Sequence, residues 1–127
     1  MARILIAEDE PSVRAFITRA LEGVGHQVEA AGDGSEALAA LERARAGGRP
    51  HELLLTDILM PVMDGISLAL AAARDAPDMP ILLMTGYSDQ RERAHGLEAI
   101  ISDILLKPFT LDELVERIEQ ALVQYPR

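Results

Sequence analysis

Short apolar runs that end in polar or charged residues constrain the fold of this sequence more than any other feature. Four of them lie at residues 3–7, 53–55, 81–84 and within 100–106, and a weaker one lies at 27–31. Each is too short for most helices, and turn residues bound most of them, which is typical of strands buried on both faces. We therefore interpret the five runs as the strands of a buried parallel sheet.

Segments with helical periodicity separate these runs. Apolar residues recur at i, i+3 and i+4 in the helix predicted at residues 12–24. Further helices are predicted around 37–41, at 66–73, at 88–99, where the apolar face is thin, and at 111–122. Gly96 interrupts the helix predicted at 88–99, which we expect to be the least stable. Thr110 and Glu113 form a capping box that opens the last helix, with Leu111, Leu114 and Ile118 expected to point inward. The alternation of five strands and five helices predicts an α/β fold with helices on both faces of the sheet.

Length and composition limit the possible functions. The 127 residues fit one domain spanning residues 1–127, because no linker divides the chain. A formal charge of −9 opposes direct binding to nucleic acid or to an anionic membrane. The sequence has no cysteine, no apolar run of about 20 residues and no signal-peptide pattern, so we expect a cytoplasmic protein.

Polar side chains follow four of the five predicted strands. Glu8 and Asp9 follow the first, Asp57 the third, Thr85 the fourth and Lys107 the fifth. The carboxyl ends of parallel strands meet at one edge of a sheet, so we expect these five side chains to lie together. Taken singly, each has an ordinary interpretation, such as a turn aspartate, a charge at a helix N-terminus or a surface lysine.

Together, these residues indicate phosphoryl chemistry. Close carboxylates repel unless a cation neutralises them, and Mg²⁺ prefers hard oxygen ligands while keeping several waters. Asp57 can act as a nucleophile toward phosphorus and form an aspartyl phosphate. A metal ion, Lys107 and the Thr85 hydroxyl would then stabilise the charge on the phosphoryl oxygens.

The strings ILIAEDEP, LLLTDILMPVMDG, ILLMTG and LLKPF occur in this order at separations that resemble the response-regulator receiver family of two-component signalling. The resemblance covers nearly the whole chain. It implies a flavodoxin-like sheet of order 2-1-3-4-5. It also implies that Asp57 accepts a phosphoryl group from the phosphohistidine of a sensor histidine kinase or a histidine phosphotransfer protein. Such a domain catalyses only its own phosphorylation and dephosphorylation.

The resemblance also implies roles for the surrounding residues. Asp9 and Asp57 would bind Mg²⁺ directly, Glu8 would act mainly through water, and the backbone carbonyl of Leu59 would be a further protein ligand. Lys107 would pair with the phosphoryl group and Thr85 would hydrogen-bond to it. The peptide bond between Lys107 and Pro108 is expected to be cis.

Three positions depart from the family pattern. Glu8 stands where the family more often has aspartate, and its longer side chain loosens the expected metal site. Ile104 occupies the position of a switch tyrosine or phenylalanine. Tyr87 either replaces that aromatic residue or is an ordinary loop tyrosine. The TGY string followed by KPF is similar to stand-alone receivers of alphaproteobacterial signalling that lack the switch aromatic.

Leu59 and Tyr87 flank the expected phosphoryl site. Neither side chain offers an acid or an amide to orient an attacking water. We therefore expect both to shield an acyl phosphate and to keep self-dephosphorylation slow.

Three functions remain open from the sequence. The first is an interaction module that binds a downstream protein through the fourth helix, fifth strand and fifth helix. The second is a phosphorelay intermediate or phosphate sink. The third, a phosphatase of the haloacid dehalogenase type, needs a second acid where Leu59 stands. Met1, directly before the first strand, fits a stand-alone receiver better than one excised from a hybrid kinase.

The three histidines lack metal-ligand spacing. His26, His51 and His95 lie far apart in the predicted fold. We expect all three to be solvated.

Overall fold

The fold is a five-stranded parallel sheet with helices on both faces. The computed structural model describes residues 1–86 and 96–124. The strands are β1 (Arg3–Ala7), β2 (Gln27–Ala31), β3 (Leu53–Asp57), β4 (Ile81–Thr85) and β5 (Asp103–Leu106). They pair in the order β2-β1-β3-β4-β5, and every neighbouring pair is parallel. The predicted flavodoxin-like α/β fold is therefore confirmed.

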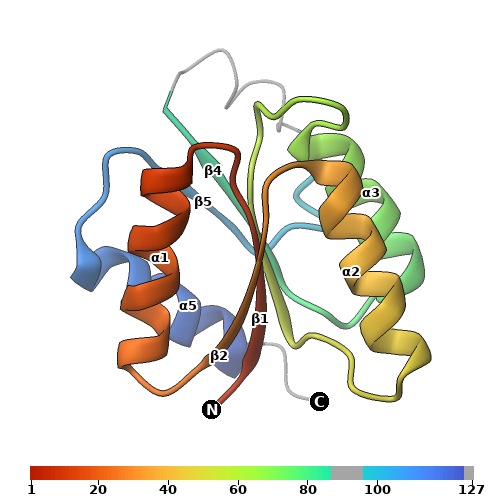
Figure 1. Cartoon of the computed structure of the whole chain (residues 1–127), viewed down its shortest axis with the longest axis horizontal. Coiled ribbons are helices and arrows are strands. Elements are labelled where there is room, and N and C mark those ends of the chain that lie inside the picture. Colours follow the sequence, from red (N-terminus) through yellow and green to blue (C-terminus); the bar gives the residue numbers. More distant parts are fainter. Residues whose placement is uncertain (87–95, 125–127) are drawn as a thin grey trace.

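Four helices within the described residues cover the two faces of the sheet. They are α1 (Pro11–Gly23), α2 (Gly34–Ala46), α3 (Gly65–Asp75) and α5 (Leu111–Gln124). Figure 1 shows α1 and α5 on one face of the sheet and α2 and α3 on the other. No helix among the described residues is long and apolar enough to cross a membrane.

Alternate residues of the central strands pack into two separate apolar layers. Leu5, Leu54 and Leu83 face α2 and α3, whereas Ile6, Leu55 and Leu82 face α1 and α5. Every residue of β3 and β4 is buried, because helices cover both sides of these strands. The core is aliphatic, and it fixes the carboxyl ends of β1, β3, β4 and β5 along one edge of the sheet.

The capping box that opens α5 is confirmed. The Glu113 amide donates to Thr110 Oγ1 at 3.1 Å, and the Thr110 amide donates to Glu113 Oε1 at 2.9 Å. Leu114 and Ile118 are buried as expected. The prediction for Leu111 was wrong: this side chain is 47% exposed, because it lies in the first turn of the helix, beyond the edge of the sheet.

The predicted fourth helix, residues 88–99, lies mostly outside the described residues. Its described part, 96–99, contains turns and no helix. Gly96 has a φ of 96°, a left-handed conformation that glycine adopts without a steric penalty. The expected interruption at Gly96 therefore coincides with a turn.

The expectation that the histidines are solvated was wrong for two of them. His26 Nδ1 accepts a hydrogen bond from the Ala2 amide at 3.0 Å, and its Nε2 lies 3.2 Å from Glu119 Oε2. His51 Nε2 lies 2.9 Å from Glu29 Oε1. Both rings are buried because these polar partners compensate for the lost water. His95 lies outside the described residues.

Burial of His51 predicts a loss of stability in mild acid. Burial lowers the pKa of His51 below its usual value, although the hydrogen bond to Glu29 acts in the opposite direction. The unfolded chain then binds a proton near its ordinary pKa of about 6.5, while the folded chain does not. The free energy of unfolding should fall as the pH drops from about 6.5 toward the lowered pKa.

Urea denaturation at about pH 7.5 and about pH 5.5 tests this expectation. The acid-induced loss should be smaller for His51→Gln, which cannot take up a proton in this range. An equal loss in both proteins would assign the pH dependence to other groups.

Candidate functional site

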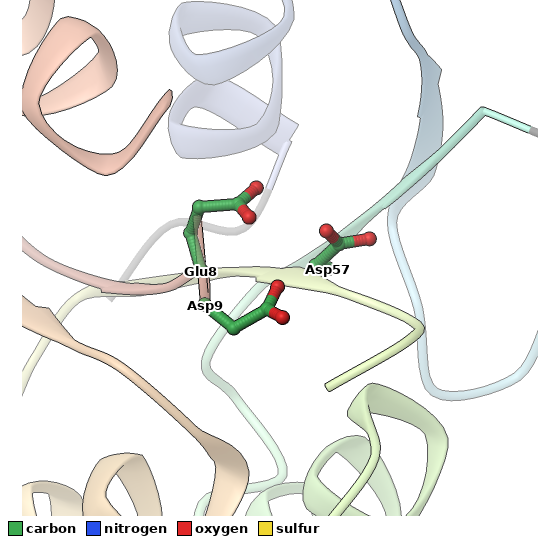
Figure 2. Close-up of side chains that lie close together, drawn as sticks. All are labelled: Glu8, Asp9 and Asp57. Carbon is green, nitrogen blue, oxygen red and sulfur yellow. The ribbon is translucent and has the colours of Figure 1, made fainter. Parts of the chain in front are cut away.

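Three carboxylates lie together at the carboxyl edge of the sheet. Glu8 and Asp9 directly follow β1, and Asp57 is the last residue of β3. One carboxylate oxygen of each lies within 4.8 Å of the others. Figure 2 shows the three side chains converging on the space between β1 and β3. We call Glu8, Asp9 and Asp57 the acidic cluster.

Asp57 has a defined orientation in this cluster. Its Oδ1 accepts a hydrogen bond from the Ile58 amide at 2.9 Å, and its Oδ2 accepts one from Lys107 Nζ at 2.7 Å. The residue is 7% exposed. The Asp57 carboxylate is thus held at the end of a fully buried strand, and its Oδ2 points toward the Lys107 ammonium group.

Lys107 bridges two members of the acidic cluster. Its Nζ lies 2.7 Å from Asp57 Oδ2 and 2.8 Å from Glu8 Oε1. Burial by itself lowers the pKa of Lys107, but the hydrogen bonds and charges of Asp57 and Glu8 outweigh it and raise the pKa above its usual value. The ammonium group therefore stays charged at neutral pH.

Two further residues predicted for the site, Thr85 and Pro108, adjoin Lys107. Thr85 ends β4 and is fully buried, and its carbonyl accepts a hydrogen bond from the Lys107 amide at 2.8 Å. The peptide bond between Lys107 and Pro108 is cis. Ile104 is partly buried and packs against the apolar layer beneath α2 and α3. Tyr87 lies outside the described residues.

A tight loop joins β3 to α3 beside Asp57. The Gly65 amide donates to the Ile58 carbonyl at 2.8 Å, and a Cβ atom on Gly65 would collide with the Asp57 carbonyl oxygen. Glycine is therefore needed at this position for close approach. Earlier in the loop, Val62 has a φ of 70° and is 83% exposed, a strained conformation for a β-branched residue.

An open hollow of about 640 Å³ leads to Asp57. Apolar side chains supply most of its wall, and Leu59, which is 49% exposed, lies on it. The lining residues are Ser12, Val13, Phe16, Asp57, Leu59, Gly86, Lys107, Pro108 and Phe109. Val13 and Phe16 of α1 belong to this wall, although the helical periodicity of residues 12–24 alone predicts apolar side chains that face the core. A small charged group can reach Asp57 through this hollow.

The donor set of the acidic cluster fits a magnesium ion. Carboxylate oxygens are the ligands that Mg²⁺ prefers, and one or two carboxylates plus water are enough for it. The exposed Asp9 side chain leaves room for that water. The cluster is therefore suited to a small hard cation, which would supply charge stabilisation to phosphoryl oxygens beside Asp57.

Comparisons with known proteins agree with this geometry. The response regulator receiver domain family matches residues 4–119. The receiver protein CpdR of Brucella abortus is 39% identical over 123 residues, covering 97% of this chain and 98% of CpdR. MprA of Mycobacterium leprae is 40% identical over 120 residues, or 94% of this chain, which spans about half the length of that regulator.

Solved structures show the same fold. A CheY-like receiver domain from Methanospirillum hungatei superposes with a TM-score of 0.87 at 30% identity, covering 98% of this chain and 96% of that one. CheY4 of Vibrio cholerae gives 0.83 at 29% identity, covering 95% and 98%. Family, relatives and fold thus agree, and the chain belongs to the response regulator receiver family of two-component signalling.

Proposed function

We propose that residues 1–127 act as a phosphorylation-controlled receiver domain in which Asp57 accepts the phosphoryl group. The donor is the phosphohistidine of a sensor histidine kinase or of a histidine phosphotransfer protein. One observation carries this proposal: the Asp57 carboxylate ends a buried strand at an open hollow, 2.7 Å from an ammonium group and beside two further carboxylates. That arrangement suits a nucleophile that must receive a charged group.

The side chains of the acidic cluster and its neighbours provide the nucleophile and the protein groups that stabilise charge in the transfer step. An Asp57 carboxylate oxygen attacks phosphorus, the bond from phosphorus to the histidine nitrogen breaks, and an acyl phosphate forms. The Lys107 ammonium and the Thr85 hydroxyl stabilise charge on the phosphoryl oxygens.

The metal ligands in this proposal come from the same edge of the sheet. Asp9, Asp57 and the Leu59 carbonyl would hold Mg²⁺, and Glu8 would interact with it through water. The ion would supply positive charge where negative charge develops on the phosphoryl group. It would also offset the repulsion between the carboxylates of the cluster.

The signal leaves the domain through a protein contact. Ile104 on β5 and residues of α5 belong to the described part of the proposed face. The fourth helix predicted for this face lies mostly outside the described residues. Leu106 at the end of β5 is 48% exposed and is available to a downstream protein. Phosphorylation of Asp57 alters this face through Thr85 and Lys107, which end β4 and follow β5.

Intact-mass spectrometry after incubation with acetyl phosphate and Mg²⁺ tests the proposed chemistry. A single phosphoryl adduct is expected on the wild-type chain and none on Asp57→Ala. Slow decay supports the switch that binds a downstream protein, whereas rapid transfer to a histidine phosphotransfer protein supports a relay. A wild-type chain that gains no adduct from acetyl phosphate or from a phosphorylated histidine kinase would contradict the proposal.

Leu59→Asn is expected to shorten the lifetime of the acyl phosphate. Leu59 lies on the wall of the hollow beside Asp57, and an amide there can orient the attacking water, which should speed hydrolysis about 10-fold or more. Tyr87→Glu is expected to act in the same direction. The lifetime is read from the decay of the adduct mass.

Leu106→Asn is the matched control, because Leu106 is equally exposed but does not line the hollow. Equal lifetimes for Leu59→Asn and Leu106→Asn would show that Leu59 does not shield the phosphoryl group.

A further inference from the structure

We propose that Gly34, the first residue of α2, is a positioning residue for the metal site. This inference rests on the proposed function and extends it to a helix that supplies none of the proposed metal ligands. Gly34 acts through residues 58–64, which join β3 to α3 and include Leu59. We call these residues the β3–α3 loop. The contact with Gly34 holds this loop in the conformation from which the Leu59 carbonyl would reach Mg²⁺.

The backbone of Met63 lies directly against Gly34. A Cβ atom on Gly34 would collide with the Met63 carbonyl oxygen and would come within 2.9 Å of the carbonyl carbon and the Cβ of Met63. The first two of these are backbone atoms, so a different rotamer of Met63 cannot make room. Figure 1 shows α2 and α3 side by side, with both helices beginning at the same edge of the sheet. Glycine at position 34 is therefore needed for the loop to lie where it does.

The start of α2 is held by several hydrogen bonds. Asp33 Oδ1 accepts one from the Glu36 amide at 2.8 Å, and Glu36 Oε1 accepts one from the Gly32 amide at 3.1 Å. Directly before this segment, the Ala31 carbonyl accepts a hydrogen bond from the Glu8 amide at 3.0 Å. The start of α2 is thus tied to the end of β1. An atom added between α2 and the β3–α3 loop would therefore displace the loop.

The β3–α3 loop has a strained conformation next to this contact. The Met63 amide donates to the Pro61 carbonyl at 2.8 Å, which closes a γ-turn with Val62 at its centre. Val62 has a φ of 70°, the strained form of this turn, and its exposed side chain gains no packing in return. Such a conformation persists only where surrounding contacts impose it. Gly34 contacts the next residue, Met63, and is placed to impose this turn.

The other end of the loop is fixed at Asp57. The Ile58 amide donates to Asp57 Oδ1 at 2.9 Å, and the Ile58 carbonyl accepts a hydrogen bond from the Gly65 amide at 2.8 Å. Leu59 follows Ile58 directly, and its side chain lies on the wall of the hollow. Because both ends of this short loop are fixed, a shift of Met63 is passed on to the residues between them, including Leu59.

Gly34→Ala tests the inference through the Mg²⁺ affinity of the whole unphosphorylated chain. Titration with Mg²⁺ is followed by the Ile58 amide signal in ¹⁵N NMR, because this amide is bonded to Asp57 Oδ1. Gly34→Ala should weaken Mg²⁺ binding about 10-fold or more, as changes to residues that orient a metal ligand do.

Gly47→Ala is the matched control on the same helix. Gly47 caps the other end of α2, and the nearest atom to a Cβ there, the Arg43 carbonyl oxygen, would lie at 3.4 Å, an ordinary contact. This variant should bind Mg²⁺ as the wild type does.

Val62→Gly separates the position of the loop from the stability of the fold. Glycine adopts a positive φ without strain, so this variant should have a higher urea midpoint than the wild type and an Mg²⁺ affinity within about 3-fold of it. In the double variant Gly34→Ala/Val62→Gly, the loop moves at a lower cost, and the urea midpoint should recover much of what Gly34→Ala loses. The Mg²⁺ affinity should stay low, because the Leu59 carbonyl stays displaced. If Gly34→Ala alone does not fold, the double variant is compared with Val62→Gly.

Equal Mg²⁺ affinity in Gly34→Ala and the wild type would overturn the inference. So would an affinity that recovers together with the urea midpoint in the double variant, because the loss would then reflect a weaker fold and not the position of the loop. Neither readout needs phosphorylation. A chain that shows the expected affinities but accepts no phosphoryl group would refute the proposed phosphoryl transfer alone, whereas a wild type that binds no Mg²⁺ would refute the proposed metal site together with this inference.

Discussion

Gly65→Ala is expected to lower the free energy of unfolding by about 3 kcal/mol, as overpacking of a rigid contact does. The added Cβ would collide with the Asp57 carbonyl oxygen and approach Ile58 Cα to 3.0 Å. All of these are backbone atoms, so relief requires α3 to move away from the end of β3. Urea denaturation followed by circular dichroism measures the loss, and phosphoryl transfer to Asp57 should fall with it.

Gly23→Ala is the matched control for this substitution. Gly23 is the last residue of α1, and a Cβ there would meet no heavy atom within 4 Å. Alanine has the higher helix propensity, so this variant should be as stable as the wild type or up to about 1 kcal/mol more stable. Equal stability of both variants would show that the approach of α3 to β3 is not rigid.

Lys107→Met is expected to lower the free energy of unfolding by about 2–3 kcal/mol at neutral pH. Without the ammonium group, the buried Glu8 carboxylate faces Asp57 with no compensating charge. This loss is smaller than that for a fully buried pair because Lys107 is 25% exposed, so that solvent screens its charge. Mg²⁺ should recover part of the loss in this variant, since the ion supplies the missing charge. Chemical denaturation with and without Mg²⁺ measures both effects.

The same substitution should change the alkaline limit of stability. The pKa of Lys107 is raised in the folded state, so its contribution is fully present below the unfolded value of about 10.4 and is lost as the pH rises through the folded value. The wild type should therefore lose stability above about pH 10.4 by an amount that is absent in Lys107→Met.

Arg74→Met controls for the removal of a cation. Arg74 is 77% exposed and lies 3.7 Å from Asp75, a surface pair of little energetic weight. A similar loss of stability in the Arg74 and Lys107 variants would argue against a special role for the bridge across the acidic cluster.

Local patterns were enough to predict the fold and the neighbourhood of Asp57. The alternation of short apolar runs with helical segments gave the parallel sheet, because period and run length distinguish strands from helices. A polar residue at the end of a buried parallel strand must lie at one edge of the sheet, which is why Glu8, Asp9 and Asp57 meet. The capping box at Thr110 could be predicted equally well, because it depends only on a spacing of three residues.

Contacts between residues far apart in the sequence could not be predicted from local patterns. His26 is buried because Glu119 lies across the sheet end, 93 residues away in sequence, and Lys107 reaches Glu8 over a separation of 99 residues. These pairs depend on side-chain length and direction in the folded chain. Gly65 illustrates the same limit. The Asp-Gly pair predicted a turn, but the sequence could not show that glycine is needed there because the Asp57 carbonyl oxygen approaches its Cα closely.

The contacts of His26 with the Ala2 amide and with Glu119 determine which end of the domain is suited to attachment to a surface. They fix the start of β1, near the N-terminus marked in Figure 1. The acidic cluster lies at the other end of this five-residue strand, roughly 16 Å away. Met1 is 93% exposed. A tag or linker joined at this residue therefore leaves the acidic cluster at the far end of the strand, directed toward the solution and toward an approaching partner.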